Sequence, residues 1–274
     1  MMKNGSLYFK TKDGTSLYVE ISGKGRPLML CHGWLCSGRC WQKNRDELNR
    51  HFQVITWDLR GHGRSQKTLA GHTIRQYASD IHEIILNFGL QDVILGGWSL
   101  GGPTVLSYWD QFGTEGRVTG VLLIDMTPFP YSPERWNSHA LKGFNADQWN
   151  AQVNQYLNNR NGFTEAFFKK CWHGEPPADA GFALEDMRAA APWSAVAIYN
   201  DYLTNDFSAV LPTVSVPTLV MSSDNHVFLA GVTQGQHITT LLPRGDYKEF
   251  TDAGHFFFFE QPEKFNQAVI SFGK

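Results

Sequence analysis

Apolar and polar positions alternate along the chain in a way that predicts short strands separated by helices. Four short, mainly apolar runs have the character of strands: residues 28–31, 53–57, 92–95 and 121–124. The first is continuously apolar, as expected of a strand buried on both faces of a sheet. Residues 73–88 instead carry apolar side chains at steps of three and four, as in an amphipathic helix that starts at Thr73 and stops at Gly89. This alternation predicts a mostly parallel, doubly wound α/β sheet.

The two ends of the chain extend the same pattern. Near the start, residues 6–10 and 16–21 flank Asp13-Gly14, a turn signal for a β-hairpin. Toward the other end, the expected elements are a strand at 216–221, a helix at 230–241, a strand at 246–251 and a helix from Gln261.

The alternation stops between residues 128 and 210. No strand pattern recurs there, and the segment is rich in prolines and aromatic residues, with fifteen aromatics in 129–207. We expect a helical cap over 128–210, inserted into one core domain made of residues 1–127 and 211–274. A short cap cannot bury every aromatic ring internally, so some should roof the functional site.

Composition narrows the class of protein. The 274 residues are 42% hydrophobic with a net charge of −2, and basic residues never form a run, so we expect no nucleic-acid or membrane partner. No apolar leader opens the chain and no stretch approaches the ~18 apolar residues of a membrane span, so we expect a cytoplasmic protein. Four unevenly spaced cysteines suggest reduced, structural thiols, and no metal site or cofactor is expected. The oligomeric state is open.

Residues 97–101, Gly-Trp-Ser-Leu-Gly, form a G-x-S-x-G motif between an expected strand and an expected helix. That context is the one a nucleophile elbow requires, because the glycines leave space for a strained serine. The helix that follows is expected to open its first turn at Pro103. Ser99 is therefore the candidate nucleophile.

A serine hydroxyl needs an adjacent base at neutral pH. Among ten histidines, His255 stands out because it follows the last expected strand, late in the chain. The oxyanion of acyl transfer also needs two N–H donors, and these are expected from Leu100, after the serine, and from Trp34, in the loop after 28–31.

Residues 32–34 (His-Gly-Trp), 58–65, 97–102 and 254–263, taken together, resemble the α/β-hydrolase superfamily. They are most similar to small esterases and cofactor-free haloperoxidases, and the His-Gly-Trp element is similar to that of pimeloyl-carrier methyl esterases. The resemblance implies an eight-stranded sheet, a Ser-His-acid triad and no cofactor.

The position of the acidic residue of the triad differs from the usual pattern of that family. The family usually carries it about nine residues after a proline equivalent to Pro217, where this chain has His226, and Asp224 lies two residues early. Some members instead carry the acid at the end of the preceding strand, where this chain has Asp125. We favour Asp125, with Asp224 as the alternative.

The substrate pocket is expected to involve His32, Trp98, Trp136 and Phe256. Alternate members of the phenylalanine run 256–259 should face the site and the core. The implied substrate is a small to medium, apolar or aromatic molecule with a carbonyl group to attack.

Three functions remain open at this stage. The favoured one is a serine hydrolase that cleaves a carboxylic ester, thioester or lactone through an acyl-enzyme. The second is a cofactor-free dioxygenase that cleaves an N-heteroaromatic ring, although such enzymes are expected to have a histidine where this chain has Leu100. The third is a non-catalytic ligand receptor.

Overall fold

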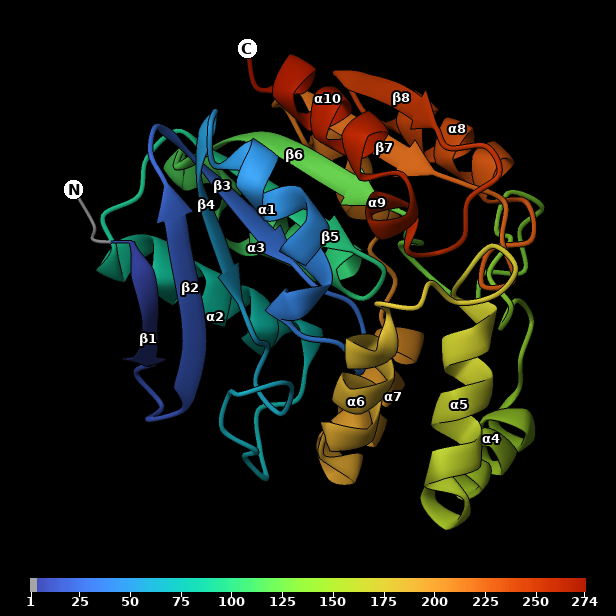
Figure 1. Cartoon of the computed structure of the whole chain (residues 1–274). Coiled ribbons are helices and arrows are strands. Elements are labelled where there is room, and N and C mark those ends of the chain that lie inside the picture. The colour runs from blue at the N-terminus through green and yellow to red at the C-terminus, as the bar shows by residue number, and fades with distance from the viewer. Residues whose placement is uncertain (1–3) are drawn as a thin grey trace.

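A single eight-stranded sheet runs through the computed structural model, which describes residues 4–274 (Figure 1). The strands are β1 (Gly5–Lys10), β2 (Ser16–Gly23), β3 (Arg26–Cys31), β4 (Phe52–Trp57), β5 (Val93–Trp98), β6 (Val118–Ile124), β7 (Thr218–Ser222) and β8 (Gly245–Glu249). Their order across the sheet is β1-β2-β4-β3-β5-β6-β7-β8. Only β1–β2 and β2–β4 are antiparallel. The expectation of a mostly parallel, eight-stranded sheet is confirmed.

Helices cover both faces of this sheet. They are α1 (Gln42–Leu48), α2 (Ile74–Asn87), α3 (Gly101–Phe112), α4 (Ala146–Asn158), α5 (Arg160–Lys170), α6 (Gly181–Ala189), α7 (Pro192–Thr204), α8 (Gly231–Leu241), α9 (Phe257–Glu260) and α10 (Pro262–Phe272). Short 3₁₀ turns are η1 (Gly38–Trp41), η2 (Gly113–Glu115) and η3 (Ser208–Thr213). Helices α1 and α10 pack together on one face, and α2 and α3 pack together on the other (Figure 1). None of the helices in the described range is long and apolar enough to cross a membrane.

Local sequence signals explain where several elements begin. The hydroxyl of Thr73 accepts a hydrogen bond from the N–H of Gln76, as an N-cap should, and α2 buries the face that its periodicity predicted. Strand β5 is buried along its whole length, as expected of a central strand. Helix α3 starts at Gly101, two residues before Pro103, which therefore lies inside the first turn rather than opening it.

Helices α4–α7 are inserted between β6 and β7 and lie together to one side of the sheet (Figure 1). Helices α4 and α5 contact each other, and α5 also contacts α6. The division of the chain into a cap over 128–210 and a core stays a prediction.

The phenylalanine run differs from expectation. The rings of residues 256–259 are all fully buried and none of them lines the cavity that contains Ser99, so the prediction that alternate members face a site is wrong. The reason is that residues 257–260 form helix α9 rather than an extended segment, and this helix is enclosed by α1, α10 and η1.

A buried ion pair anchors the loop that follows β4. The Nε and Nη2 atoms of Arg60 donate to the two carboxylate oxygens of Asp80 in α2 at 2.7 and 2.6 Å, and both side chains are 1% exposed. The third nitrogen, Nη1, donates to Asp13, which is 45% exposed. Two carboxylates therefore neutralise one buried guanidinium, and the buried carboxylate of Asp80 makes the bidentate contact.

Asp80→Asn should lower the free energy of unfolding by about 3 kcal/mol, because it leaves a buried charge without its main partner. The matched control, Asp13→Asn, should cost about 1 kcal/mol or less, since that carboxylate is half-exposed. Urea unfolding followed by circular dichroism measures both. An equal loss in the two variants would contradict this account of the loop.

Candidate active site

The backbone at Ser99 adopts the strained conformation that an elbow requires. Its φ is 54°, and it lies between the end of β5 and the start of α3. A β-carbon at position 97 would collide with the carbonyl oxygen of Gly101, so glycine is required there. A β-carbon at position 33 would lie 3.0 Å from the β-carbon of Ser99, which shows how closely the loop after β3 approaches the serine.

The structure brings His255 and Asp125 into contact. The Nδ1 atom of His255 lies 2.6 Å from Oδ2 of Asp125, and the two side chains are 2% and 1% exposed. The side-chain amide of Asn225 and the N–H of Ser223 also donate to this carboxylate. Burial raises the pKa of Asp125, and the hydrogen bond to His255 opposes that rise. A carboxylate held by three donors is arranged to orient an imidazole.

Asp224 has a different role in the structure. It is exposed, and its carboxylate accepts a hydrogen bond from the N–H of Val232 in the first turn of α8. Its neighbour Asn225 turns the other way, toward Asp125. The carboxylate that contacts His255 is therefore Asp125 and not Asp224.

Aromatic rings hold the imidazole of His255 in place. The ring centroid of Trp98 lies 4.9 Å from it, and that of Phe228 lies 5.6 Å from it. The indole N–H of Trp98 also donates to the backbone carbonyl of His255 at 3.0 Å. Among residues 4–274, no hydrogen bond joins the hydroxyl of Ser99 to His255. Such contacts often tighten only when substrate binds.

Two backbone N–H groups beside Ser99 lack an acceptor. Within the described residues, neither Trp34 N–H nor Leu100 N–H donates a hydrogen bond to the protein. Leu100 occupies the N-cap position of α3 without a side-chain capping bond, at the helix end where the dipole favours negative charge. Trp34 precedes Leu35, whose φ of 62° is strained. These two amides are the ones the sequence proposed as oxyanion donors.

His32 supports this loop rather than lining a pocket. Its Nδ1 lies 2.8 Å from the carbonyl oxygen of Gly33, and its Nε2 accepts from the N–H of Leu59 at 2.9 Å. The side chain is completely buried, and burial lowers its pKa to about 4. The expectation that His32 lines the pocket is wrong, because both ring nitrogens are used to fix the backbone next to Trp34.

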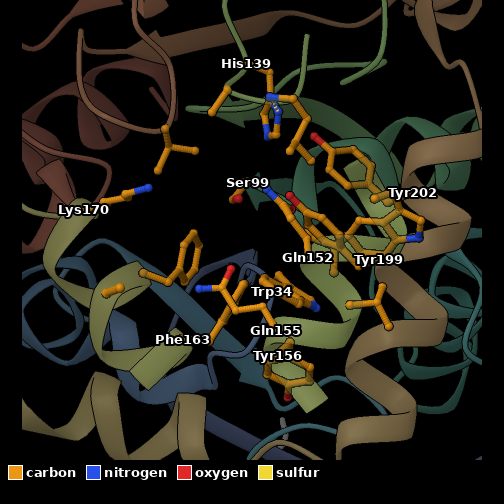
Figure 2. Close-up of a pocket in the computed structure, with 18 of the residues that line it drawn as sticks. Trp34, Ser99, His139, Gln152, Gln155, Tyr156, Phe163, Lys170, Tyr199 and Tyr202 are labelled. Atoms are coloured by element: carbon orange, nitrogen blue, oxygen red, sulfur yellow. Dashed lines mark hydrogen bonds between the residues drawn. The ribbon is translucent and has the colours of Figure 1, made fainter. Parts of the chain in front are cut away.

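A cavity of about 190 Å³ opens above Ser99. Figure 2 shows Ser99 at its centre, surrounded by side chains from the inserted helices. Six aromatic residues of the insertion line it: Trp149, Tyr156, Phe163, Phe167, Tyr199 and Tyr202. The ring of Trp34 lines it as well, and its indole N–H donates to the carbonyl of Ala195. The expectation that aromatic residues of 129–207 roof the serine is confirmed.

Three further pocket residues were predicted wrongly. Trp98 and Phe256 pack against each other beneath the site, with ring centroids 4.4 Å apart, and neither lines the cavity. Trp136 stacks on His237 of α8, away from the cavity. Aromatic character alone did not distinguish rings that pack beneath Ser99 and His255 from rings that line the cavity.

The polar side chains that line the cavity were not predicted from the sequence. Gln152, Gln155 and Lys170 come from α4 and α5, and His139 comes from the segment before them. A signal was present in α4, where residues 149, 152, 153 and 156 repeat at three- and four-residue steps and so share one helix face. Which face turns toward Ser99 depends on tertiary packing.

The cysteines and possible metal ligands are not part of this site. All four cysteines, Cys31, Cys36, Cys40 and Cys171, are buried and unpaired. Within residues 4–274, no three histidine, cysteine, aspartate or glutamate side chains gather as a metal site would require.

Comparisons with known proteins identify the family of the chain. Residues 28–268 match the family described as "Alpha/beta hydrolase family". The chain is 29% identical to a non-heme haloperoxidase of Rhodococcus erythropolis, covering 97% of this chain and 98% of that one. It is 25% identical to a pimeloyl-[acyl-carrier protein] methyl ester esterase of Nitrosospira multiformis, covering 94% and 98%. The solved structure of an esterase from Exiguobacterium antarcticum superposes with a TM-score of 0.87 at 23% identity, covering 97% and 98%.

Asp125→Asn should lower kcat by about 10⁴-fold, because an amide donates where Nδ1–H of His255 needs an acceptor. The matched control, Asp224→Asn, should lower kcat less than about tenfold, because an exposed capping residue tolerates its amide. Steady-state kinetics with a chromogenic ester measures both. The reverse ranking would assign the acid to Asp224, and small equal losses would mean that neither aspartate serves as the acid.

Proposed function

The chain belongs to the alpha/beta hydrolase family, and from this premise we propose that it is a serine hydrolase that cleaves small carboxylic esters, thioesters or lactones through an acyl-enzyme. The observation that carries the proposal is the contact between His255 Nδ1 and Asp125 beside a serine with positive φ. Relatives named as esterases support hydrolysis as the class of reaction.

Each residue then has a definite part in the reaction. The hydroxyl of Ser99 attacks the carbonyl carbon and passes its proton to Nε2 of His255, while Asp125 holds the proton on Nδ1 and stabilises the imidazolium. The N–H groups of Trp34 and Leu100 donate to the oxyanion of the tetrahedral intermediate. The leaving alcohol or thiol takes the proton from His255. Water then attacks the acyl-enzyme by the same route and releases the acid.

The cavity supports a small substrate. Its volume of about 190 Å³ is below the several hundred Å³ common for ligand pockets, and aromatic side chains make up much of its wall. An apolar or aromatic group beside the scissile carbonyl suits such a lining. Leu100 follows the serine, where a ring-cleaving dioxygenase of this fold is expected to have a histidine, and this favours hydrolysis.

Ser99→Ala should lower kcat for a chromogenic acetate ester by at least about 10³-fold, because the nucleophile is lost while the oxyanion donors remain. The matched control is Ser107→Ala, a buried serine two turns further along α3, which should keep its activity. Labelling with a fluorophosphonate should be lost in Ser99→Ala and retained in Ser107→Ala. Activity of Ser99→Ala close to wild type, with labelling at another residue, would contradict the proposal.

A further inference from the structure

The polar side chains around the cavity donate hydrogen bonds but carry no negative charge. Besides Ser99 and the hydroxyls of Tyr156, Tyr199 and Tyr202, they are His139, Gln152, Gln155, Lys170 and His226, and no aspartate or glutamate lines the cavity. The catalytic Asp125 is buried behind His255 and is already bonded to three donors. A ligand in this cavity therefore meets one permanent cation and no anion.

Lys170 is that cation. It is the last residue of α5, and Figure 2 shows its amine extending toward Ser99. Among residues 4–274, Lys170 forms no ion pair and no hydrogen bond, whereas the adjacent Lys169 lies 3.8 Å from Glu165. Both lysines lie in the last turn, where the helix dipole favours cations, but only Lys170 lines the cavity. The dipole therefore does not explain why its amine faces the serine.

Neutral donors surround the same space. The side chains of Gln152, half-buried, and Gln155, exposed, come from α4 and form no hydrogen bond to another described residue (Figure 2). Nδ1 of His139 accepts from the N–H of Leu141 at 3.1 Å, so its proton lies on Nε2. Burial lowers the pKa of His139 to about 3, which keeps the ring neutral near pH 7.

We propose that the cavity selects esters that carry a free carboxylate, such as the monoesters of short dicarboxylic acids, with the carboxylate held by Lys170 and the glutamine amides. This inference rests on the proposed function and specifies its substrate class. A carboxylate only accepts hydrogen bonds, and the ammonium of Lys170 and the NH2 groups of the two glutamine amides are the donors available to it in the cavity. Water adds across the scissile acyl bond, releasing an alcohol and the second carboxylic acid group of the product.

The test compares matched substrates. The monomethyl esters of succinic, glutaric and adipic acids are each compared with the methyl alkanoate that has a methyl group in place of the carboxylate. The measured quantity is the ratio of kcat/KM for the monoester to kcat/KM for the alkanoate. In the wild-type protein we expect this ratio to exceed one for at least one chain length and to fall with rising salt, since the mouth of the cavity is open to solvent.

Lys170→Gln should lower this ratio by about fivefold, the scale of a partly exposed ion pair, and Lys170→Glu should lower it further. Lys169→Gln is the matched control, because it removes an equal charge one residue away, outside the cavity, and the ratio should stay at its wild-type value. A ratio that Lys170→Gln leaves unchanged, or that Lys169→Gln lowers equally, would overturn the inference while leaving the hydrolase proposal intact.

If no ester of either kind is hydrolysed, the proposed function fails and binding tests the cavity separately. The fluorescence of Trp34 and Trp149, which line the cavity, reports binding to the Ser99→Ala protein. Tighter binding of the monoester than of the alkanoate, lost when Lys170→Gln is added, would support the inference. Equal binding of the two would overturn it.

Discussion

The strained backbone at Ser99 is the constraint on which the site depends. A φ of 54° at a non-glycine residue persists only where the surroundings enforce it. Here β5 and α3 meet so closely that no β-carbon fits at position 97, and a β-carbon at position 101 would lie 2.7 Å from the carbonyl oxygen of Cys31. The serine, the N-terminus of α3 and the loop after β3 are therefore fixed together. The backbone N–H groups of Trp34 and Leu100, the proposed oxyanion donors, gain their positions from that packing.

The surrounding residues divide into those that hold the loops carrying Ser99 and His255 and those that line the cavity. His32, Trp98 and Phe256 belong to the first group, because each is buried among backbone or aromatic partners beneath the site. The helices inserted between β6 and β7 supply most of the second group. Under the proposed function, substitutions in the insertion would change the substrate without disturbing the serine or the histidine.

Local signals in the sequence predicted most of the fold and the centre of the candidate site. Periodicity located the strands and α2, and the glycine pattern located Ser99. Counting from Pro217 could not separate Asp125 from Asp224, because the answer depends on how the loop after β7 directs Asn225. The pocket was predicted poorly because tertiary packing decides which faces of the inserted helices turn toward Ser99. Aromatic residues that pack beneath the site also cannot be told in the sequence from aromatic residues that line the cavity.

The most direct test of the central claim is to observe the acyl-enzyme itself. The wild-type protein is mixed with a chromogenic ester, quenched in acid during turnover, digested and analysed by peptide mass spectrometry. The account predicts a burst of about one equivalent of leaving group and an acyl group on the peptide that carries Ser99. Steady turnover without a burst and with no acyl group on that peptide, or an acyl group on a different residue, would contradict it.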